Sequence, residues 1–398
     1  MTDVTFDRLF RGIDREQFLD QYFDKAPYYQ AGSVDSVSDL FSWGRMNDLL
    51  ARPKLWDSNT IEMALDGRVL PPPQYCRPGH GRQGEQGLRP DRGKVTALLQ
   101  KGATFVLDFL EGIDPEVASV SRALERLTGA NTSCNAYCSW KSVRGYASHF
   151  DCMDVFALQI EGEKTWNLYE GRFPEAAFVP GSRPSDFTAE QHDRMKGKLV
   201  QQVTTRPGDL LYLPRGLYHD ALATDTASLH LSFGSTPAVG VAVLEMIARE
   251  MQGQEYFRKR LPHFEDRAAL AAYLQGIGQT VNKVVADPAF HDFVANFQKD
   301  RIFDKVADYR FPEREADGYF FVSRYAPTLQ EAGAALKVSH RGTTFELAAA
   351  DKDMLAWILG REDFWLSQLS EAHGQRGEAG RQLIQTLIQN RVIFPVAV

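Results

Sequence analysis

Three side chains on two separate segments could together bind a metal ion. The first segment contains His149 and Asp151, separated by one residue, and the second, RPGDLLYLPRGLYHD, contains His219. Side chains two positions apart in an extended strand point to the same face, so His149 and Asp151 could share one cation. A His-x-Asp pair alone is weak evidence in a chain with nine histidines. A similar pair in His263-Phe264-Glu265 lies in a charged, helix-like stretch, and we set it aside.

The second segment positions its histidine with turns. Residues 207–209 and 214–216 favour turns, and they lie on either side of a short apolar strand. His219 lies three positions after the second turn. Two imidazoles and one carboxylate on a single face of a metal ion leave three coordination positions open. This arrangement is diagnostic of non-haem Fe(II) oxygenases. The two segments therefore predict a mononuclear iron site formed by His149, Asp151 and His219.

A lysine between these segments could bind a cosubstrate. Oxygen activation requires electrons, and a chelating 2-oxo acid supplies two of them by decarboxylation, but its distal carboxylate needs a buried cation. Residues 155–160 predict a strand and residues 161–163 a reversal of the chain, after which Lys164 begins the returning strand with Trp166 and Leu168 on its own side. We expect Lys164 to bind that carboxylate. A surface lysine in a hairpin is the alternative.

These motifs resemble those of a known family. The runs NAY, HFD, DVFALQIEGEKTWNLY and PGDLLYLPRGLYH are similar to those of the JmjC-type ribosomal oxygenases, cupin-fold 2-oxoglutarate- and Fe(II)-dependent hydroxylases of ribosomal proteins. The resemblance extends from about Phe18 to the C-terminus and is strongest over residues 102–234. It implies that His149, Asp151 and His219 bind Fe(II), that Lys164 binds the C5 carboxylate of 2-oxoglutarate, and that O2 is the second cosubstrate.

The resemblance also implies roles for residues on the barrel strands. It places Asn135 and Tyr137 beside the cosubstrate and the target side chain, and Ser232 where the family commonly has a hydroxyl near the cosubstrate. Gly234 replaces a frequent serine on the substrate side. Lysine at position 164 is typical of the eukaryotic-type histidyl hydroxylases, whereas the bacterial arginyl type has arginine there. Because both cations hold a carboxylate, Lys164 does not assign the target to Arg or His.

The length and the elements of the chain predict an α+β protein with several domains. A chain of 398 residues is too long for one ordinary core. We expect a double-stranded β-helix (cupin or JmjC jelly roll) with N-terminal helices at 1–237, a helical region at 238–310, and a winged-helix-like domain at 311–398. The helical region follows from the helical spacing of apolar residues after Pro237, and the winged-helix-like domain follows from the resemblance. The resemblance also implies that the helical region forms a homodimer. Packing of those helices onto the cupin is the alternative.

Several supporting elements are predicted from local patterns. Residues 14–26 predict an amphipathic helix that Pro27 stops, and Ser38 is the expected N-cap of the next helix. Residues 71–93, rich in Pro, Gly and Arg, predict a long surface loop. Residues 102–110 predict a buried strand and residues 115–127 a helix.

Composition limits the partners and the compartment. A net charge of −7 disfavours nonspecific binding to nucleic acid or an anionic membrane. No apolar run is long enough to span a membrane, and MTDVTFDRLF is unlike a secretory signal, so we expect a cytoplasmic protein. The C-terminal domain has a slight acidic excess, which favours a structural or protein-binding role over DNA binding. The chain has four cysteines whose spacing indicates neither disulfides nor zinc, and we expect reduced thiols: Cys76, Cys134, Cys138 and Cys152.

Alternative functions remain open from the sequence. A hydroxylase of this type could act on a ribosomal protein, or it could tailor a biosynthetic peptide or small molecule. The acidic surface favours a basic partner. A metal cupin that works without 2-oxoglutarate, such as an isomerase, would use the same three ligands but would not need Lys164. A scaffold that has lost catalysis would not need the triad.

Overall fold

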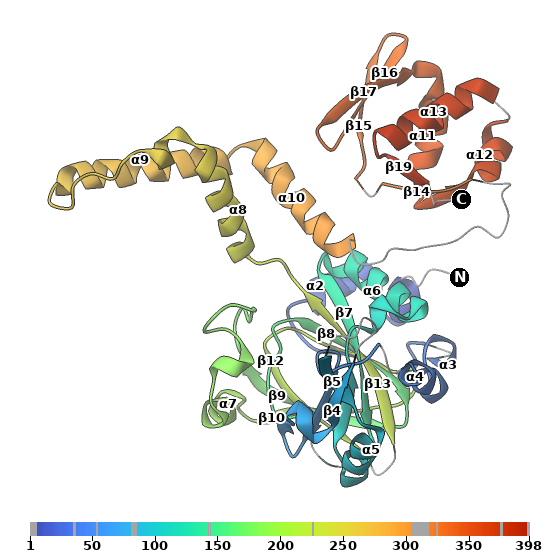
Figure 1. The fold of residues 1–398 in the computed structure, drawn as a ribbon, viewed down its shortest axis with the longest axis vertical. Coiled ribbons are helices and arrows are strands. Elements are labelled where there is room, and N and C mark those ends of the chain that lie inside the picture. The colour runs from blue at the N-terminus through green and yellow to red at the C-terminus, as the bar shows by residue number, and fades with distance from the viewer. Residues whose placement is uncertain are drawn as a thin grey trace. The chain divides into compact units, whose positions relative to one another are not determined.

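The chain folds into two compact units, Met1–Val306 and Ala307–Val398. Figure 1 shows the fold. The computed structural model describes all residues except 1–5, 35–36, 53–54, 81–85, 142, 144, 225–226, 304–317, 324, 375–376 and 396–398. Each unit has its own hydrophobic core, and the two are described separately below.

The first unit is built on two antiparallel sheets. The large sheet has eight strands in the order β1-β11-β8-β13-β7-β6-β2-β3, and the small sheet has the order β10-β9-β12. The large sheet comprises β1 (Tyr28–Gln30), β11 (Leu210–Leu213), β8 (Asp154–Glu161), β13 (Ser228–Thr236), β7 (Asn131–Ser139), β6 (Thr104–Leu107), β2 (Ile61–Leu65) and β3 (Arg68–Val69). The small sheet comprises β10 (Leu199–Thr205), β9 (Lys164–Arg172) and β12 (Leu217–Ala223).

The space between the sheets is partly apolar and partly polar. An apolar cluster joins side chains of both sheets, including Ala157 on β8, Leu211 on β11, and Trp166 and Leu168 on β9. This contact closes the sheets into a jelly-roll barrel, because residues that alternate along each strand meet face to face. We call the enclosed space the lumen.

Helices cover the outer face of the large sheet. The main core packs Phe18, Leu124, Phe156 and Leu231 together, so it joins two helices to the sheet. The helices of this part are α1 (Phe6–Leu9), α2 (Arg15–Gln21), α3 (Val37–Leu40), α4 (Trp43–Leu50), α5 (Arg92–Lys101) and α6 (Pro115–Thr128), and α7 (Ala189–Met195) precedes β10. Short 3-10 turns occur at Pro72–Gln74, Leu110–Gly112 and Pro184–Asp186.

Most supporting elements are confirmed, and two expectations for the N-terminal helices are corrected. The helix α2 begins after its Asp14 N-cap but ends at Gln21, before Pro27. Ser38 lies inside α3 and does not cap the next helix, because Ser42 accepts the Arg45 N–H and begins α4. The predicted strand and helix appear as β6 and α6.

The expected loop at residues 71–93 was wrong over most of its length. It contains the paired strands β4 (Cys76–His80) and β5 (Gln86–Pro90), which form a separate two-stranded sheet. Proline and glycine are tolerated there because each strand is an edge. Residues 81–85 lie outside the described residues.

The reversal before Lys164 is confirmed, but it is not a hairpin. β8 pairs with β11 and β13, whereas β9 pairs with β10 and β12, so the turn carries the chain from the large sheet to the small one. Gly162 has φ +64°, and a Cβ there would lie 2.0 Å from the carbonyl oxygen of Ala227. Only glycine fits this corner.

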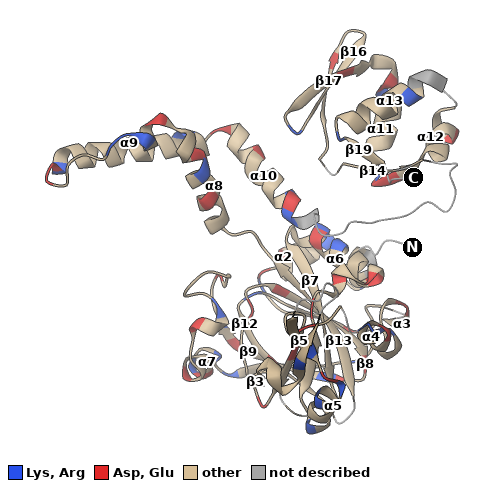
Figure 2. Ribbon diagram, viewed as in Figure 1, with Lys and Arg blue, Asp and Glu red and all other residues tan. Residues whose placement is uncertain are grey.

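Helices follow the barrel, as predicted. They are α8 (Gly240–Gly253), α9 (Arg267–Val285) and α10 (Pro288–Phe303), with a 3-10 turn at Glu255–Arg258. The end of α10 returns to the barrel, where the Asn131 side chain donates to the Arg301 carbonyl at 3.2 Å. Apolar side chains on these helices are exposed, including Val241, Leu244 and Leu274. Both signs of charge are distributed along them (Figure 2). Dimerisation through these helices stays a prediction.

The second unit combines two small sheets with three helices. One sheet has β14 (Tyr319–Val322) between β18 (Asp363–Trp365) and β19 (Ile393–Pro395), and the other has β15 (Thr328–Ala332), β16 (Ala335–His340) and β17 (Thr343–Ala348). The helices are α11 (Lys352–Leu359), α12 (Leu366–His373) and α13 (Gly377–Gln389), and a 3-10 turn spans Ala349–Asp351. The end of the predicted last strand, residues 396–398, lies outside the described residues. The winged-helix assignment and the three-domain division stay predictions.

Candidate metal centre

The structure brings His149, Asp151 and His219 together at one end of the lumen. One ligand atom from each side chain lies within 4.8 Å of the others. The His219 Nε2 atom is 3.5 Å and the His149 Nε2 atom 3.8 Å from the two Asp151 carboxylate oxygens. No other such group of three His, Cys, Asp or Glu residues occurs in the described ranges. The pair that we set aside, His263 and Glu265, is exposed.

The backbone around the first two ligands differs from the expected strand. His149 and His219 form an isolated bridge, with N–H to carbonyl distances of 3.0 and 2.8 Å, and no ladder continues from it. Asp151 lies in irregular backbone, where its carbonyl accepts the Gly216 N–H at 2.8 Å. The i, i+2 spacing therefore brought the right residues together, although the regular strand on which the expectation relied is absent.

Hydrogen bonds orient both imidazole rings. The Nδ1 atom of His149 contacts the Ala147 carbonyl at 2.8 Å, and that of His219 contacts the Leu217 carbonyl at 3.0 Å. Each Nδ1 therefore carries the proton, and each Nε2 presents a lone pair toward the Asp151 carboxylate. Burial and the neighbouring His149 lower the pKa of His219, which favours the neutral, metal-binding form. Two nitrogen donors and one carboxylate fit a divalent iron-type cation with open positions.

Lys164 lies deep in the same lumen. Its side chain is 5% exposed, and its Nζ lies 5.7 Å from the centre of the Tyr137 ring and 6.0 Å from that of Trp166. Burial lowers the pKa of Lys164 to about 7, and among the described residues no carboxylate offsets this. A buried amine without a counter-charge is costly, and an anionic ligand would relieve that cost. The surface-lysine alternative is wrong.

His230, which was not predicted as a site residue, lies beside Lys164. Its Nδ1 is 3.5 Å from the Lys164 Nζ, and its ring stacks on Tyr137 with centroids 4.9 Å apart. Burial and the Lys164 charge lower the pKa of His230, so the ring is neutral. The signal was present in the sequence, because His230 precedes Ser232 by two positions and shares its strand face.

The other predicted site residues share this lumen-facing side. In the ladder between β13 and β7, Ser232 lies opposite Asn135 and His230 opposite Tyr137. The Asn135 side-chain oxygen also accepts the Phe109 N–H at 3.4 Å. A Cβ on Gly234 would lie 2.3 Å from the Met153 sulfur, so a serine there would need Met153 to move. The structure groups these residues, and their roles stay predictions.

Two carboxylates continue the same wall of the barrel. Across the ladder, Tyr137 lies opposite Val106, and Val106 lies opposite Glu62. The Tyr146 hydroxyl donates to Glu62 at 2.5 Å, and the Tyr146 ring lies 6.2 Å from the His149 ring. Asp108 follows β6, and burial together with Glu62 and Glu111 raises its pKa to about 7. This acidic pair, Glu62 and Asp108, was not predicted from the sequence.

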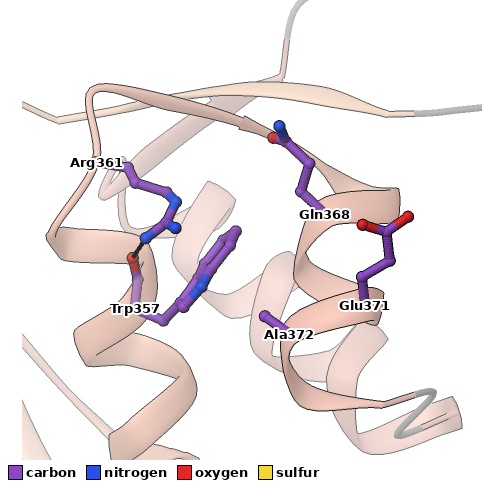
Figure 3. A pocket seen from close by; sticks show the side chains of 5 residues that line it. All are labelled: Trp357, Arg361, Gln368, Glu371 and Ala372. Atoms are coloured by element: carbon purple, nitrogen blue, oxygen red, sulfur yellow. Dashed lines mark hydrogen bonds between the residues drawn. The ribbon is translucent and has the colours of Figure 1, made fainter.

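A pocket lies elsewhere, on the second unit. It has a volume of about 410 Å³ and lies between α11 and α12, lined by Trp357, Arg361, Gln368, Glu371 and Ala372 (Figure 3). The Arg361 guanidinium lies 3.7 Å from the centre of the Trp357 ring. This stacked pair fills one side of the pocket, which has no metal-ligand set. The four cysteines are free, buried thiols, as predicted.

The chain is similar in sequence to several known proteins. Residues 112–241 match the family described as "JmjC domain". The Danio rerio protein named Ribosomal oxygenase 1 is 31% identical over 303 residues, which cover 73% of this chain and 51% of that protein. The Culex quinquefasciatus protein named Bifunctional lysine-specific demethylase and histidyl-hydroxylase NO66 is 30% identical over 207 residues, covering 52% of this chain and 30% of that protein. The chain thus spans about half or less of these relatives.

A solved structure shows the same fold. It is the Escherichia coli ribosomal oxygenase YcfD in complex with cobalt and 2-oxoglutarate, with a TM-score of 0.57, 14% identity, and coverage of 97% of this chain and 99% of that chain. The expected JmjC cupin-type fold with mixed α and β content is therefore confirmed. Separately, none of the helices in the described part of the chain combines the length and apolar composition needed to cross a membrane.

Proposed function

Because the chain carries a JmjC domain related to those of the ribosomal oxygenases, we propose that it is an Fe(II)- and 2-oxoglutarate-dependent oxygenase that hydroxylates a side chain of a ribosomal protein. One observation carries the proposal. The three candidate ligands converge within 4.8 Å, and a lysine that is 5% exposed lies in the same lumen. A metal cupin that worked without a dicarboxylate cosubstrate would have no use for that buried amine.

The two ends of the lumen would bind different groups. His149, Asp151 and His219 would hold the metal ion on one face, and Lys164 would hold the C5 carboxylate of 2-oxoglutarate. When bound, Fe(II), 2-oxoglutarate and O2 supply the oxidation of an unactivated C–H bond, with succinate as the co-product. The aromatic rings around Lys164 exclude water, which strengthens its attraction for a carboxylate.

The position of the acidic pair supports a basic target. Glu62 shares the lumen-facing row of Tyr137, and Asp108 follows β6 beside Asn135. Among the described residues, the charged groups that shift the pKa of Asp108 are the carboxylates Glu62 and Glu111, and no Lys or Arg offsets them. An arginine side chain, charged at every physiological pH, would interact more favourably with these carboxylates than a neutral imidazole would. We therefore propose arginine before histidine as the hydroxylated residue.

The test is an oxygenation assay with the cell's own ribosomal proteins. The purified protein is incubated with Fe(II), 2-oxoglutarate and O2, succinate is measured, and the ribosomal proteins are analysed by mass spectrometry. We expect one ribosomal protein to gain the mass of one oxygen atom on an arginine. Succinate without any such gain would favour the tailoring of a biosynthetic peptide or small molecule. Absence of succinate with every substrate would contradict the oxygenase itself.

The same proposal includes the assembly and the location. Exposed apolar side chains on α8 and α9, such as Leu244 and Leu274, support a homodimer formed by residues 238–310. A winged-helix-like domain at 311–398 would then bind protein, not nucleic acid. We propose a cytoplasmic location because the enzyme would have access to ribosomal proteins there. Size measurement in solution by light scattering tests the dimer, and a monomeric mass would contradict it.

A further inference from the structure

A buried carboxylate joins the two segments that carry the histidine ligands. Asp220, which directly follows His219, is 1% exposed. One of its oxygens accepts from the Ser148 hydroxyl at 2.5 Å and from the Tyr169 hydroxyl at 2.7 Å, and the other accepts from the Asn167 amide at 2.7 Å. Ser148 directly precedes His149. The Asp220 side chain thus contacts Ser148, the residue before His149, and Asp220 itself is the residue after His219.

Asp220 acts from outside the lumen. Successive side chains on a strand point to opposite faces, so Asp220 points away from the side on which His219 meets the other ligands. Its partner across the ladder is Asn167, which points the same way. The Gln202 amide donates to the Asn167 oxygen at 2.9 Å, and this leaves the Asn167 amide group directed at Asp220. The Asp220 contacts therefore form an ordered polar network behind the metal centre.

The segment from Ala147 to Asp151 is held in place without a sheet ladder. Two backbone connections join it to the strand that carries the third ligand: the bridge between His149 and His219, and the bond from the Gly216 N–H to the Asp151 carbonyl. Phe150 also anchors the segment, because its side chain is fully buried and its ring stacks on that of Phe173 with centroids 4.8 Å apart. The Ser148 side chain adds a buried polar contact through its hydrogen bond to Asp220.

We propose that Asp220 is a positioning residue for the metal centre, which sets the mutual orientation of His149 and His219 before the metal binds. The inference rests on the proposed metal-binding role of the triad. Partners of this kind typically change metal affinity by about 10- to 100-fold when they are removed. The cause is preorganisation, because a segment held in the binding geometry loses less conformational freedom when the metal arrives.

The barrel offers a matched control. Asp209 is also buried, at 5% exposure, and also accepts three hydrogen bonds, from the Tyr29 hydroxyl at 2.8 Å and from the Gly32 and Arg206 N–H groups at 2.9 Å each. It connects the turn before β11 to the N-terminal part of the chain, and these hydrogen bonds involve neither a histidine ligand nor a residue adjacent to one. Loss of Asp209 leaves these three donors without an acceptor, and loss of Asp220 leaves at least three. Loss of Asp220 alone also releases the segment that carries His149.

The experiment measures metal binding, not turnover. Co(II) is titrated into the full-length metal-free protein and into the variants Asp220→Ala and Asp209→Ala, with the visible absorption of Co(II) as the signal, and each apoprotein is melted. We expect both variants to lower the melting temperature. Asp220→Ala should weaken Co(II) binding about 10- to 100-fold and change the Co(II) spectrum, whereas Asp209→Ala should keep the wild-type dissociation constant and spectrum.

A second variant keeps the test decisive if Asp220→Ala does not fold. Ser148→Ala removes only the contact to the segment that carries His149, and we expect a smaller loss of Co(II) affinity with an unchanged melting temperature within a few degrees. Wild-type affinity in Ser148→Ala, or equal losses in Asp220→Ala and Asp209→Ala, would overturn the positioning role. Failure of the wild-type protein to bind Co(II) would instead overturn the proposed function.

Discussion

The two ends of the lumen are built differently. At the metal end, His149 and Asp151 lie on irregular backbone that one isolated bridge and a few hydrogen bonds hold in place. At the deep end, Lys164 begins a strand that is paired on both sides, and His230 lies on a strand that is likewise paired on both sides. The metal end depends on local polar contacts, whereas the deep end depends on the ladders.

This difference indicates which physical property determines ligand binding at each end. The metal end has its donors oriented in advance by hydrogen bonds to each Nδ1, so its function depends on geometry. The deep end has a fixed backbone but an amine without a counter-charge, so its function depends on electrostatics. Substitutions at the metal end should therefore change metal affinity, and those at the deep end should change affinity for the dicarboxylate and its dependence on pH.

Removal of a metal ligand should have the largest effect. In His219→Ala one of the three donors is lost, and we expect Co(II) affinity and succinate formation to fall by more than the roughly 100-fold that outer partners cause. His263→Ala, at the exposed pair, is the matched control and should change neither quantity. Retention of metal binding in His219→Ala, measured by the same Co(II) titration, would contradict the assignment of His219 as a metal ligand.

Removal of the buried amine should have the next largest effect, and it should spare the metal. Lys164→Ala leaves the bound carboxylate without its partner, which costs about 2–5 kcal/mol, or at least about 30-fold in affinity for 2-oxoglutarate. Co(II) affinity without 2-oxoglutarate should stay at the wild-type value. Lys164→Arg, which keeps the charge, should restore part of the affinity. A loss of metal binding in Lys164→Ala would show that the two ends are not separate.

The pH dependence of cosubstrate binding should report the deep end. In the free protein burial lowers the pKa of Lys164 to about 7, whereas the ammonium form binds a carboxylate. Below pH 7 the amine is already protonated, and above it binding must take up a proton. Affinity for 2-oxoglutarate should therefore fall about tenfold for each pH unit above 7. The dependence should disappear in Lys164→Arg, because arginine keeps its proton. Calorimetric titration from pH 6 to pH 9 tests this, and an identical slope in Lys164→Arg would contradict it.

The acidic pair should have the smallest effect, restricted to the target. Asp108→Asn removes one carboxylate from the wall of the lumen, and we expect the KM for a basic target peptide to rise about two- to tenfold, which corresponds to about 0.5–1.5 kcal/mol. Affinities for Co(II) and for 2-oxoglutarate should not change. A change in the 2-oxoglutarate affinity, with the KM of the peptide unaltered, would assign Asp108 to the deep end instead.

The sequence predicted more of the site than of its supports. The spacing of His149 and Asp151 and the turns before His219 were sufficient to identify the ligand set, because these signals are local. The strand inferred around His149 is absent, since the segment is held by tertiary contacts that no local pattern encodes. Lys164 was found from the reversal before it, but the change of sheets at that corner depends on pairing partners distant in sequence.

The residues that were missed share a physical reason. His230 and Glu62 lie on strands whose pattern gives the face of each residue but not its neighbours across the lumen. Asp220 follows a ligand and points away from it, which in sequence terms indicates a solvent-facing residue. Its burial at 1% exposure comes from the segment packed over it, which carries Ser148. Such contacts form only when distant parts of the chain meet.

A crystal structure of the full-length protein with Co(II) and 2-oxoglutarate tests the central claim most directly. We predict one metal ion within about 2.0–2.2 Å of the His149 and His219 Nε2 atoms and an Asp151 oxygen. We also predict the C5 carboxylate of 2-oxoglutarate within hydrogen-bond distance of the Lys164 Nζ. A metal ion bound elsewhere, or a 2-oxoglutarate whose C5 carboxylate points away from Lys164, would contradict the account.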